Sequence, residues 1–292
     1  MHDMLMDDAR APGGFRVGEA LRSRAVELAL GLLLLGLLYH SVIPSMVADW
    51  RMDENYSHGF LVPAVSAWFL WRERRRLLDA PLAPSWLGLP LVMLGLAQLA
   101  LGSVAVELFT MRSSLVTLSM GLVLHFLGLQ ALRVALFPLA YLLFMVPLPA
   151  TAYNAVAFPL KLLVTDASVA ILKALGIAVL QEGNILHFPE TTLEVADACS
   201  GMRSLVSLGA LGAAYAFMLP LPAVSRAILV LASVPIAMSA NILRVVGTGL
   251  LSHHWSPRAA MGFFHEFAGL AVFVMAMLLI MGLGALLRRF GR

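Results

Sequence analysis

Residues 264–287 read FHEFAGLAVFVMAMLLIMGLGALL, and the basic sequence RRFGR (288–292) follows directly. An apolar run of about 20 residues is long enough for an α-helix to cross the hydrocarbon layer of a membrane. Arginines directly after such a run are typical of its cytoplasmic end. The stretch therefore predicts a transmembrane helix in an integral membrane protein.

The composition of the whole chain supports a membrane protein. Of its 292 residues, 60% are hydrophobic and 13% are charged, whereas soluble domains carry about 25% charged residues. The formal net charge is +3, but 18 of the 20 basic residues are Arg, and most lie at the ends of apolar runs. Membrane orientation explains this pattern, so we infer no nucleic-acid binding. The single cysteine, Cys199, excludes an intramolecular disulfide.

Eight apolar segments are predicted to be transmembrane helices. They are residues 25–47, 56–71, 86–106, 113–130, 134–149, 201–219, 227–250 and 264–287. The expected architecture is an all-α polytopic membrane protein with a single membrane-embedded domain at 25–287. A cytoplasmic tail at 1–24 precedes this domain, and a basic cytoplasmic tail at 288–292 follows it.

Segment 153–179 is apolar as well, but it contains charged residues. Lys161, Asp166 and Lys173 lie within it, together with Pro159. Charged side chains are costly at the depth of the bilayer centre. The segment is therefore predicted to be an interfacial or re-entrant helix, and a ninth full span is the alternative.

The basic residues also predict the orientation of the chain. With eight spans, 13 of the 20 basic residues fall on one side, which is then the cytoplasmic side. These are Arg10, Arg16, Arg22, Arg24, Arg72, Arg74, Arg75, Arg76, Arg133, Arg226, Arg288, Arg289 and Arg292. The outer side then receives the acidic loop 48–58, a short loop near Glu107, the stretch 180–198 and the loop 251–263.

The stretch 180–198 is the only extended segment outside the apolar runs. It reads LQEGNILHFPETTLEVADA. Hydrophobic and polar residues alternate at 185–188 and again at 192–195, with Pro189 and Glu190 between the two runs. Such alternation around a turn predicts a small β-hairpin on the outer side.

Three chemically distinctive side chains are predicted at the outer ends of helices. Cys199 precedes the sixth span, Arg244 lies near the outer end of the seventh, and His265 begins the eighth. In a cysteine nucleophile site the thiolate attacks a carbonyl group and an imidazole exchanges protons, while a guanidinium stabilises the oxyanion or orients the substrate. The shared depth of the three residues therefore predicts a membrane-embedded cysteine peptidase or transpeptidase.

The neighbours of Cys199 favour the reactive form of its thiol. Cys199 lies near a helix N-terminus, where the helix dipole stabilises the thiolate. Arg203 follows at i+4, so it shares a helical face with the cysteine and can stabilise the anion further. Ser200 suits a tight turn that leads into the helix.

Two further residues are predicted to support Arg244 and His265. Asn241 lies three residues before Arg244 on the same helical face, where it can hold the guanidinium or contact substrate. Gly269 lies four residues after His265 and would permit the close approach of another helix.

Other interpretations of these residues stay open. A lone cysteine in an apolar protein is usually inert, and Arg244 could be an anchor that reaches to the membrane surface. The pair His253 and His254 could suggest zinc together with His265, but no well-spaced further ligands accompany them, so neither a metal nor a cofactor is expected. The alternative functions are a transporter or flippase and a non-catalytic assembly subunit. A transporter predicts polar residues through the bilayer midplane, whereas here they cluster at one face.

Four blocks of the chain, taken in order, resemble the exosortase/archaeosortase family. They are YSHGFLVP (56–63), ADACSGMRSL (196–205), NILRV (241–245) and HEFAG (265–269). The order Cys199, Arg244 and His265 resembles the catalytic triad proposed for that family. The first block adds His58 as a supporting or substrate-binding residue. The resemblance covers most of the chain, from about residue 25 to residue 287.

The resemblance implies a bacterial exosortase, an inner-membrane cysteine peptidase or transpeptidase whose active site faces the periplasm. Family members act on secreted proteins with a C-terminal sorting signal, which consists of a Pro-Glu-Pro motif, a transmembrane helix and a basic cluster. Hydrolysis and transfer to an acceptor both stay open, and the activity often accompanies exopolysaccharide production. The implied roles are nucleophile for Cys199, oxyanion or substrate binding for Arg244, and proton donor and acceptor for His265.

Overall fold

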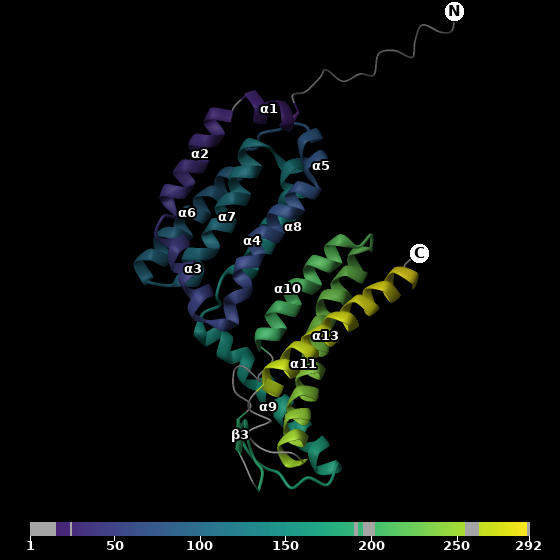
Figure 1. Ribbon diagram of the computed structural model, residues 1–292. Helices are drawn as coiled ribbons and strands as arrows, with labels where there is room; N and C mark the ends of the chain where they lie inside the picture. The colour runs from purple at the N-terminus through teal and green to yellow at the C-terminus, as the bar shows by residue number, and fades with distance from the viewer. Residues whose placement is uncertain (1–15, 24, 190–191, 195–201, 255–262, 291–292) are drawn as a thin grey trace, which may run out of the picture. The chain divides into compact units, whose positions relative to one another are not determined.

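The computed structural model describes residues 16–23, 25–189, 192–194, 202–254 and 263–290. The chain forms two compact units, residues 1–147 and residues 148–292, and each is treated by itself below (Figure 1). Helices make up most of both units, so the prediction of an all-α membrane fold is confirmed.

The first unit consists of helices of very different lengths. They are α1 (Val17–Ser23), α2 (Ala25–Leu38), α3 (Val42–Met52), the 3₁₀-helix η1 (Glu54–Phe60), α4 (Leu61–Arg72), α5 (Arg74–Asp79), α6 (Gly88–Ala105), α7 (Leu108–Phe126), α8 (Leu129–Tyr141) and the 3₁₀-helix η2 (Leu142–Met145). Helices α6 and α7 form an antiparallel pair at the centre of this unit.

Glycines at intervals of seven residues bring α6 close to α7. A Cβ atom on Gly88, Gly95 or Gly102 would lie under 3.0 Å from backbone atoms of α7. Small residues let helix backbones approach closely, which is how transmembrane helices pack in the absence of a hydrophobic driving force between them. The tight turn between the two helices passes through Val106, whose φ of 55° is left-handed.

The expected single helix at 25–47 is broken into α2 and α3, which meet at an angle of 64°. Pro44 explains the break, because it lacks an amide hydrogen and its ring would collide with the carbonyl of residue 40 in a continuous helix. Between the two helices, Tyr39 is fully buried, and its hydroxyl lies 2.7 Å from Oγ of Ser114 on α7. The bend is therefore fixed by packing as well as by the proline.

Segments that the sequence predicts on opposite sides of the membrane lie near opposite ends of α4. Near its last turn, where the basic cluster 72–76 lies, Arg16 Nη1 is 3.5 Å from Asp79 Oδ1, and α1 lies beside α5 (Figure 1). Near its first turn, Trp50 Nε1 donates a hydrogen bond of 2.9 Å to the carbonyl of Met145. The segments predicted inside thus lie near one end of α4, and those predicted outside lie near the other.

In its described residues, the second unit combines four long helices with a small sheet. Its elements are α9 (Ala150–Ala174), β1 (Leu180–Glu182), β2 (Ile185–His187), β3 (Thr192–Glu194), α10 (Met202–Met218), α11 (Ala223–His254) and α13 (Phe263–Phe290). Helices α10, α11 and α13 pack on one another around Leu208, Leu229 and Ile280, whose side chains are fully buried (Figure 1).

The sheet confirms the predicted hairpin and adds a strand to it. Strands β2 and β3 pair in antiparallel fashion, with Ile185 opposite Glu194. Strand β1 pairs with the other edge of β2 through a two-residue turn at Gly183, whose φ is 61°. Phe188, just after β2, packs with Leu172 of α9 near Gly249 of α11. The sheet is thereby attached to α9 and α11.

The number of membrane spans differs from the expected eight. Within the described residues, five helices are long and apolar enough to cross a membrane, or six if α2 and α3 form one bent span. The five are Gly88–Ala105, Leu108–Phe126, Ala150–Ala174, Ala223–His253 and Gly269–Phe290. The segments expected at 56–71, 134–149 and 201–219 are helical but shorter, so the count of eight is not confirmed.

Helix α9 meets the same length and composition criteria as the other candidate spans. The expectation of an interfacial or re-entrant helix at 153–179 is therefore not confirmed, and its length suits the alternative of a further span. Pro159 does not interrupt the helix. The charge of Asp166 is accommodated by a hydrogen bond of 2.6 Å, which its Oδ1 accepts from Nε2 of Gln181.

Candidate functional site

Helix α11 carries the two polar residues of the block NILRV. Asn241 is buried, with 4% of its surface exposed, and Arg244 is half-buried. Both side chains border one small cavity inside the bundle of α10, α11 and α13. The prediction that Asn241 and Arg244 share a helical face is therefore confirmed.

Helix α13 meets Arg244 at Gly269. A Cβ atom on Gly269 would lie 3.2 Å from Nη2 and 3.3 Å from Cζ of Arg244, and these are the nearest atoms to it. The guanidinium group thus lies against the backbone of α13. Gly269 was expected to permit a close approach of helices; the group found closest to it is instead the charged head of the Arg244 side chain.

The cavity beside Arg244 is small and mostly enclosed. Its volume is about 10 Å³, and Leu208 of α10, Ala240 of α11 and Ala276 of α13 also border it. One water molecule requires about 10–15 Å³ by the same kind of measure. The guanidinium therefore has little spare room on the buried side of the bundle.

The remaining predicted site residues are described only in part. Cys199 and Ser200 lie outside the described residues. The backbones of Arg203 and His265 belong to the first turns of α10 and α13, but their side chains are not described. By its position in α13, His265 precedes Gly269 by one helical turn.

His58 belongs to the first unit, where it contacts backbone groups. It lies in η1, and its Nε2 is 3.0 Å from the carbonyl oxygen of Phe144. That carbonyl lies at the tightened end of α8 and η2, just before the chain turns at Pro147. A neutral imidazole that donates here satisfies a carbonyl without an intrahelical partner, so His58 has a supporting contact within its own unit.

The environment of His58 favours its neutral form. Burial lowers the pKa of His58, since burial disfavours the charged imidazolium. Hydrogen bonds to the backbone at Phe144 and Asn55 oppose this shift, because they favour the charged form. The downward direction prevails.

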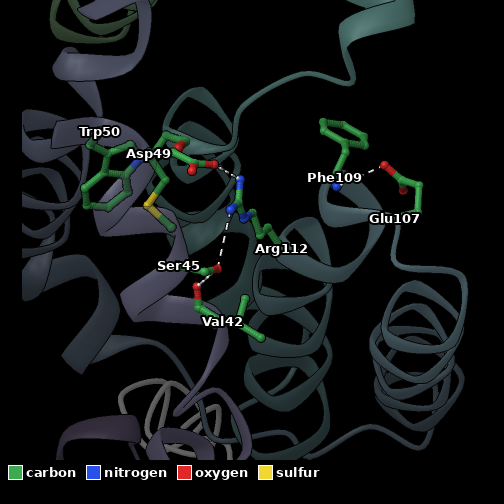
Figure 2. Close-up of polar contacts among 8 residues, drawn as sticks. Val42, Ser45, Asp49, Trp50, Glu107, Phe109 and Arg112 are labelled. Carbon is green, nitrogen blue, oxygen red and sulfur yellow. Dashed lines mark hydrogen bonds and ion pairs between the residues drawn. The ribbon is translucent and has the colours of Figure 1, made fainter. Parts of the chain in front are cut away.

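A buried ion pair in the first unit was not anticipated from the sequence. Arg112 of α7 is 2% exposed, and its Nη1 lies 2.6 Å from Oδ2 of Asp49 on α3 (Figure 2). Its Nη2 also donates a hydrogen bond of 3.4 Å to Oγ of Ser45. The signal that could have found it is the position of Arg112 at the edge of an apolar run, since charges there are functional or paired by default.

The turn before α7 ends in a helix cap, also visible in Figure 2. The carboxylate of Glu107 accepts hydrogen bonds from the backbone amides of Phe109, at 3.0 Å, and Thr110, at 2.7 Å. Its hydrogen bonds with Thr110 and Phe109 lower the pKa of Glu107, those with Thr110 most strongly. The cap satisfies amides that the first helical turn leaves without partners.

A metal centre finds no support in the part of the chain that the structure describes. Among those residues, no group of three or more His, Cys, Asp or Glu side chains is placed to hold a metal ion. Asn241 and Arg244 supply one amide and one guanidinium. Such groups recognise carbonyl oxygens and anions through their N–H donors.

Comparison with protein families gives one match that covers most of the chain. The family of transmembrane exosortases matches residues 50–282. This range contains all four sequence blocks in full, and it includes α11 and most of α13, the two helices that meet at Arg244. No curated protein and no solved structure matches the chain.

Proposed function

The chain belongs to the transmembrane exosortase family, and on that premise we propose that it is a membrane-embedded cysteine peptidase or transpeptidase. Its substrates are the C-terminal sorting signals of secreted proteins. It resides in the bacterial inner membrane with its active site facing the periplasm. Transfer to an acceptor and a link to exopolysaccharide production belong to the same proposal.

The meeting of α11 and α13 at Arg244 and Gly269 is the observation that carries the proposed chemistry. Gly269 lies on α13 one turn from His265, a rise of about 6 Å. A guanidinium against Gly269 is thus within a few ångströms of the helical turn that bears the histidine. This proximity supports a joint role for Arg244 and His265, with Asn241 as a supporting residue beside Arg244.

The proposed reaction uses Cys199 as the nucleophile. His265 takes the proton of the thiol, and the thiolate attacks the scissile carbonyl carbon near the Pro-Glu-Pro motif. Arg244 stabilises the oxyanion that forms when the C=O electron pair moves onto oxygen. The C–N bond then breaks, His265 protonates the leaving amine, and a thioester remains. Water or an acceptor amine then attacks the thioester carbonyl while His265 takes its proton. The C–S bond breaks and releases the acid or the amide, and His265 returns the proton to the Cys199 thiolate.

The neighbours of Cys199 have supporting roles in this scheme. Ser200 would shape the turn that presents the thiol, and Arg203 would favour the thiolate from one turn below. His58 would support the outer loop through its contact with the Phe144 carbonyl. No cofactor is required for any step.

Processing of a secreted reporter that carries a C-terminal sorting signal tests the proposal. Cys199→Ala and His265→Ala should abolish processing, and Cys199→Ser should leave little, because a serine hydroxyl is far less acidic than a thiol. Arg244→Lys should lose most activity, since a point charge does not replace a planar fork. Wild-type processing by Cys199→Ala at matched protein levels would disprove the nucleophile and favour a non-catalytic subunit.

The proposed orientation can be tested separately. Both termini should be cytoplasmic and the stretch 180–198 should be outside, because the basic residues concentrate at the opposite ends of the helices. Reporter fusions after Leu287 and insertions within 180–198 would report the two sides. A C-terminus on the outer side would contradict the orientation and the periplasmic active site.

A further inference from the structure

We infer that Gly269 is a positioning residue for the guanidinium of Arg244, an inference that rests on the proposed function of Arg244. Because Gly269 has no side chain, the guanidinium of Arg244 lies directly against the backbone of α13 at this residue. We call this position at Gly269 the seat of the guanidinium. A methyl group in this seat would displace the guanidinium and lower the rate of processing, although Gly269 itself touches neither the substrate nor the reacting atoms.

The contact involves the charged head of Arg244. The three atoms nearest to a Cβ built on Gly269 are Nη2, Cζ and Nη1 of Arg244, at 3.2, 3.3 and 3.6 Å. The first two distances are tighter than ordinary van der Waals contact. An alanine at this position therefore requires the guanidinium or the helix to shift by a few tenths of an ångström.

The surroundings leave the guanidinium few directions in which to move. The cavity beside it holds about 10 Å³, and Asn241, Ala240 and Ala237 on the same helix are 4% exposed or less. Interiors of this density transmit small displacements. The shift must therefore carry the guanidinium away from α13, toward the side on which Arg244 is partly exposed.

A shift of this kind affects the proposed chemistry because of the register of α13. Gly269 and His265 share a helical face one turn apart, so the seat sets the separation between Arg244 and the turn that bears the histidine. Stabilisation of an oxyanion depends on donors held close to their productive geometry. A misplacement of about 1 Å can cost about a hundredfold in rate, so a shift of a few tenths of an ångström should cost about fourfold.

Two other glycines provide matched controls. Gly282 on α13 and Gly247 on α11 lie in helical segments, and a Cβ on either would meet nothing within 4 Å. The three substitutions to alanine bring similar gains in helix propensity. Only the methyl group added at Gly269 contacts Arg244, so the other two substitutions control for the change in helix propensity.

The first measurement is the rate of processing in membranes at matched protein levels, with the full-length chain. Gly269→Ala should lower kcat/KM about fourfold, whereas Gly282→Ala and Gly247→Ala should stay within about 1.5-fold of wild type. A loss in kcat at constant KM would indicate displacement of the oxyanion donor, and a rise in KM would indicate displacement of a substrate-binding group. A rate for Gly269→Ala equal to that of the two controls would overturn the inference.

The second measurement reports the contact without any assay of processing. Arg244→Met removes the guanidinium and leaves space above Gly269. In that background Gly269→Ala should raise the unfolding temperature as much as Gly282→Ala does, and in the wild-type background it should raise it less or lower it. Equal effects of Gly269→Ala in both backgrounds would show that Arg244 does not occupy the seat and would overturn the inference.

The two measurements also separate this inference from the proposed function. If Cys199→Ala processes like wild type, the proposed function fails while the stability comparison still tests the seat. If Gly269→Ala does not accumulate, recovery of the protein in Gly269→Ala/Arg244→Met supports the contact. Failure to recover counts against it.

Discussion

Arg112 in the first unit and Arg244 in the second both lie among apolar helices, but different groups face them. Arg112 is 2% exposed and has the carboxylate of Asp49 at 2.6 Å and the hydroxyl of Ser45 at 3.4 Å. Arg244 is half-buried and lies against the backbone of Gly269, beside a cavity that it shares with Asn241.

This difference separates a structural arginine from a candidate for catalysis. A carboxylate at 2.6 Å neutralises the guanidinium of Arg112 and ties α7 to α3, so its interaction energy is used within the fold. Gly269 brings no side chain, and its backbone is one of the surfaces against which the guanidinium of Arg244 lies. An arginine in an apolar segment is a functional candidate by default, and the groups that face it decide which kind of role it has.

The largest expected effect comes from removing Arg112. Arg112→Met should lower the free energy of unfolding by about 3 kcal/mol, the lower end of the range for broken buried pairs, because Asp49 is 34% exposed. Arg244→Met should leave the protein folded and abolish processing. Thermal unfolding in detergent and reporter processing measure the two quantities. If Arg112→Met lost processing without losing stability, Arg112 would have a functional role, and its contrast with Arg244 would not hold.

The double variant Arg112→Met/Asp49→Leu is the control for that experiment. Apolar replacement of both members of a buried ion pair is often close to neutral. The double variant should therefore recover most of the lost stability and retain processing. Persistent loss of processing in a stable double variant would assign the pair a functional role.

The second prediction concerns Arg203 and the reactivity of the thiol. Arg203→Met keeps the length of the side chain and removes its charge. It should shift half-alkylation of Cys199 to higher pH by roughly half a unit, the size expected for an interaction below 1 kcal/mol. Because Cys199 is the only thiol of the chain, labelling in vesicles needs no correction for other cysteines. Superimposable pH profiles would leave Arg203 a structural or substrate-binding residue.

The third prediction concerns His58. His58→Leu should cost about 1 kcal/mol, because the carbonyl of Phe144 loses its donor. His58→Gln offers another N–H donor, so it should cost less and retain processing. A stable His58→Gln variant that does not process the reporter would favour a substrate-binding role over a supporting one.

The pH dependence of stability sharpens the same comparison. Because burial lowers the pKa of His58, the unfolded chain binds a proton at a higher pH than the folded chain does. The corresponding stability is fully present above the ordinary histidine pKa and is lost as the pH falls through the lowered value. Wild type should therefore lose more stability than His58→Gln below about pH 6.5. Parallel pH profiles would contradict the neutral, buried imidazole.

The smallest expected effect is at the helix cap. Glu107→Ala removes the acceptor for the amides of Phe109 and Thr110, and it should cost about 0.5–1 kcal/mol. The pKa of Glu107 is lowered by these hydrogen bonds, so the cap stabilises the protein above the ordinary carboxyl pKa and is lost as the pH falls through the lowered one. Thermal unfolding at neutral pH and near pH 3 measures the difference. An undiminished effect at the lower pH would contradict the charged cap.

Several elements could be predicted from local sequence. The elements that were predicted wrongly or not at all also have sequence features that indicate them. The alternation at 185–188 predicts β2, and the dipeptide Gly183-Asn184, which favours a two-residue hairpin turn, is the local signal for β1. The break before α3 could have been predicted from Pro44. The charged residues of segment 153–179 favoured an interfacial helix, whereas the apolar length of α9 is the local signal for a span.

The sequence by itself determined the membrane class, most of the apolar helical segments and the family, because apolar length and short motifs are properties of neighbouring residues. It also placed Asn241 on the face of Arg244, since the helical repeat links residues three apart. Only the tertiary structure decided that Arg112 pairs with Asp49 and that Arg244 lies against Gly269. Each of these contacts joins residues on different helices. Which faces of two helices meet depends on how all their side chains pack, and no local pattern contains that information.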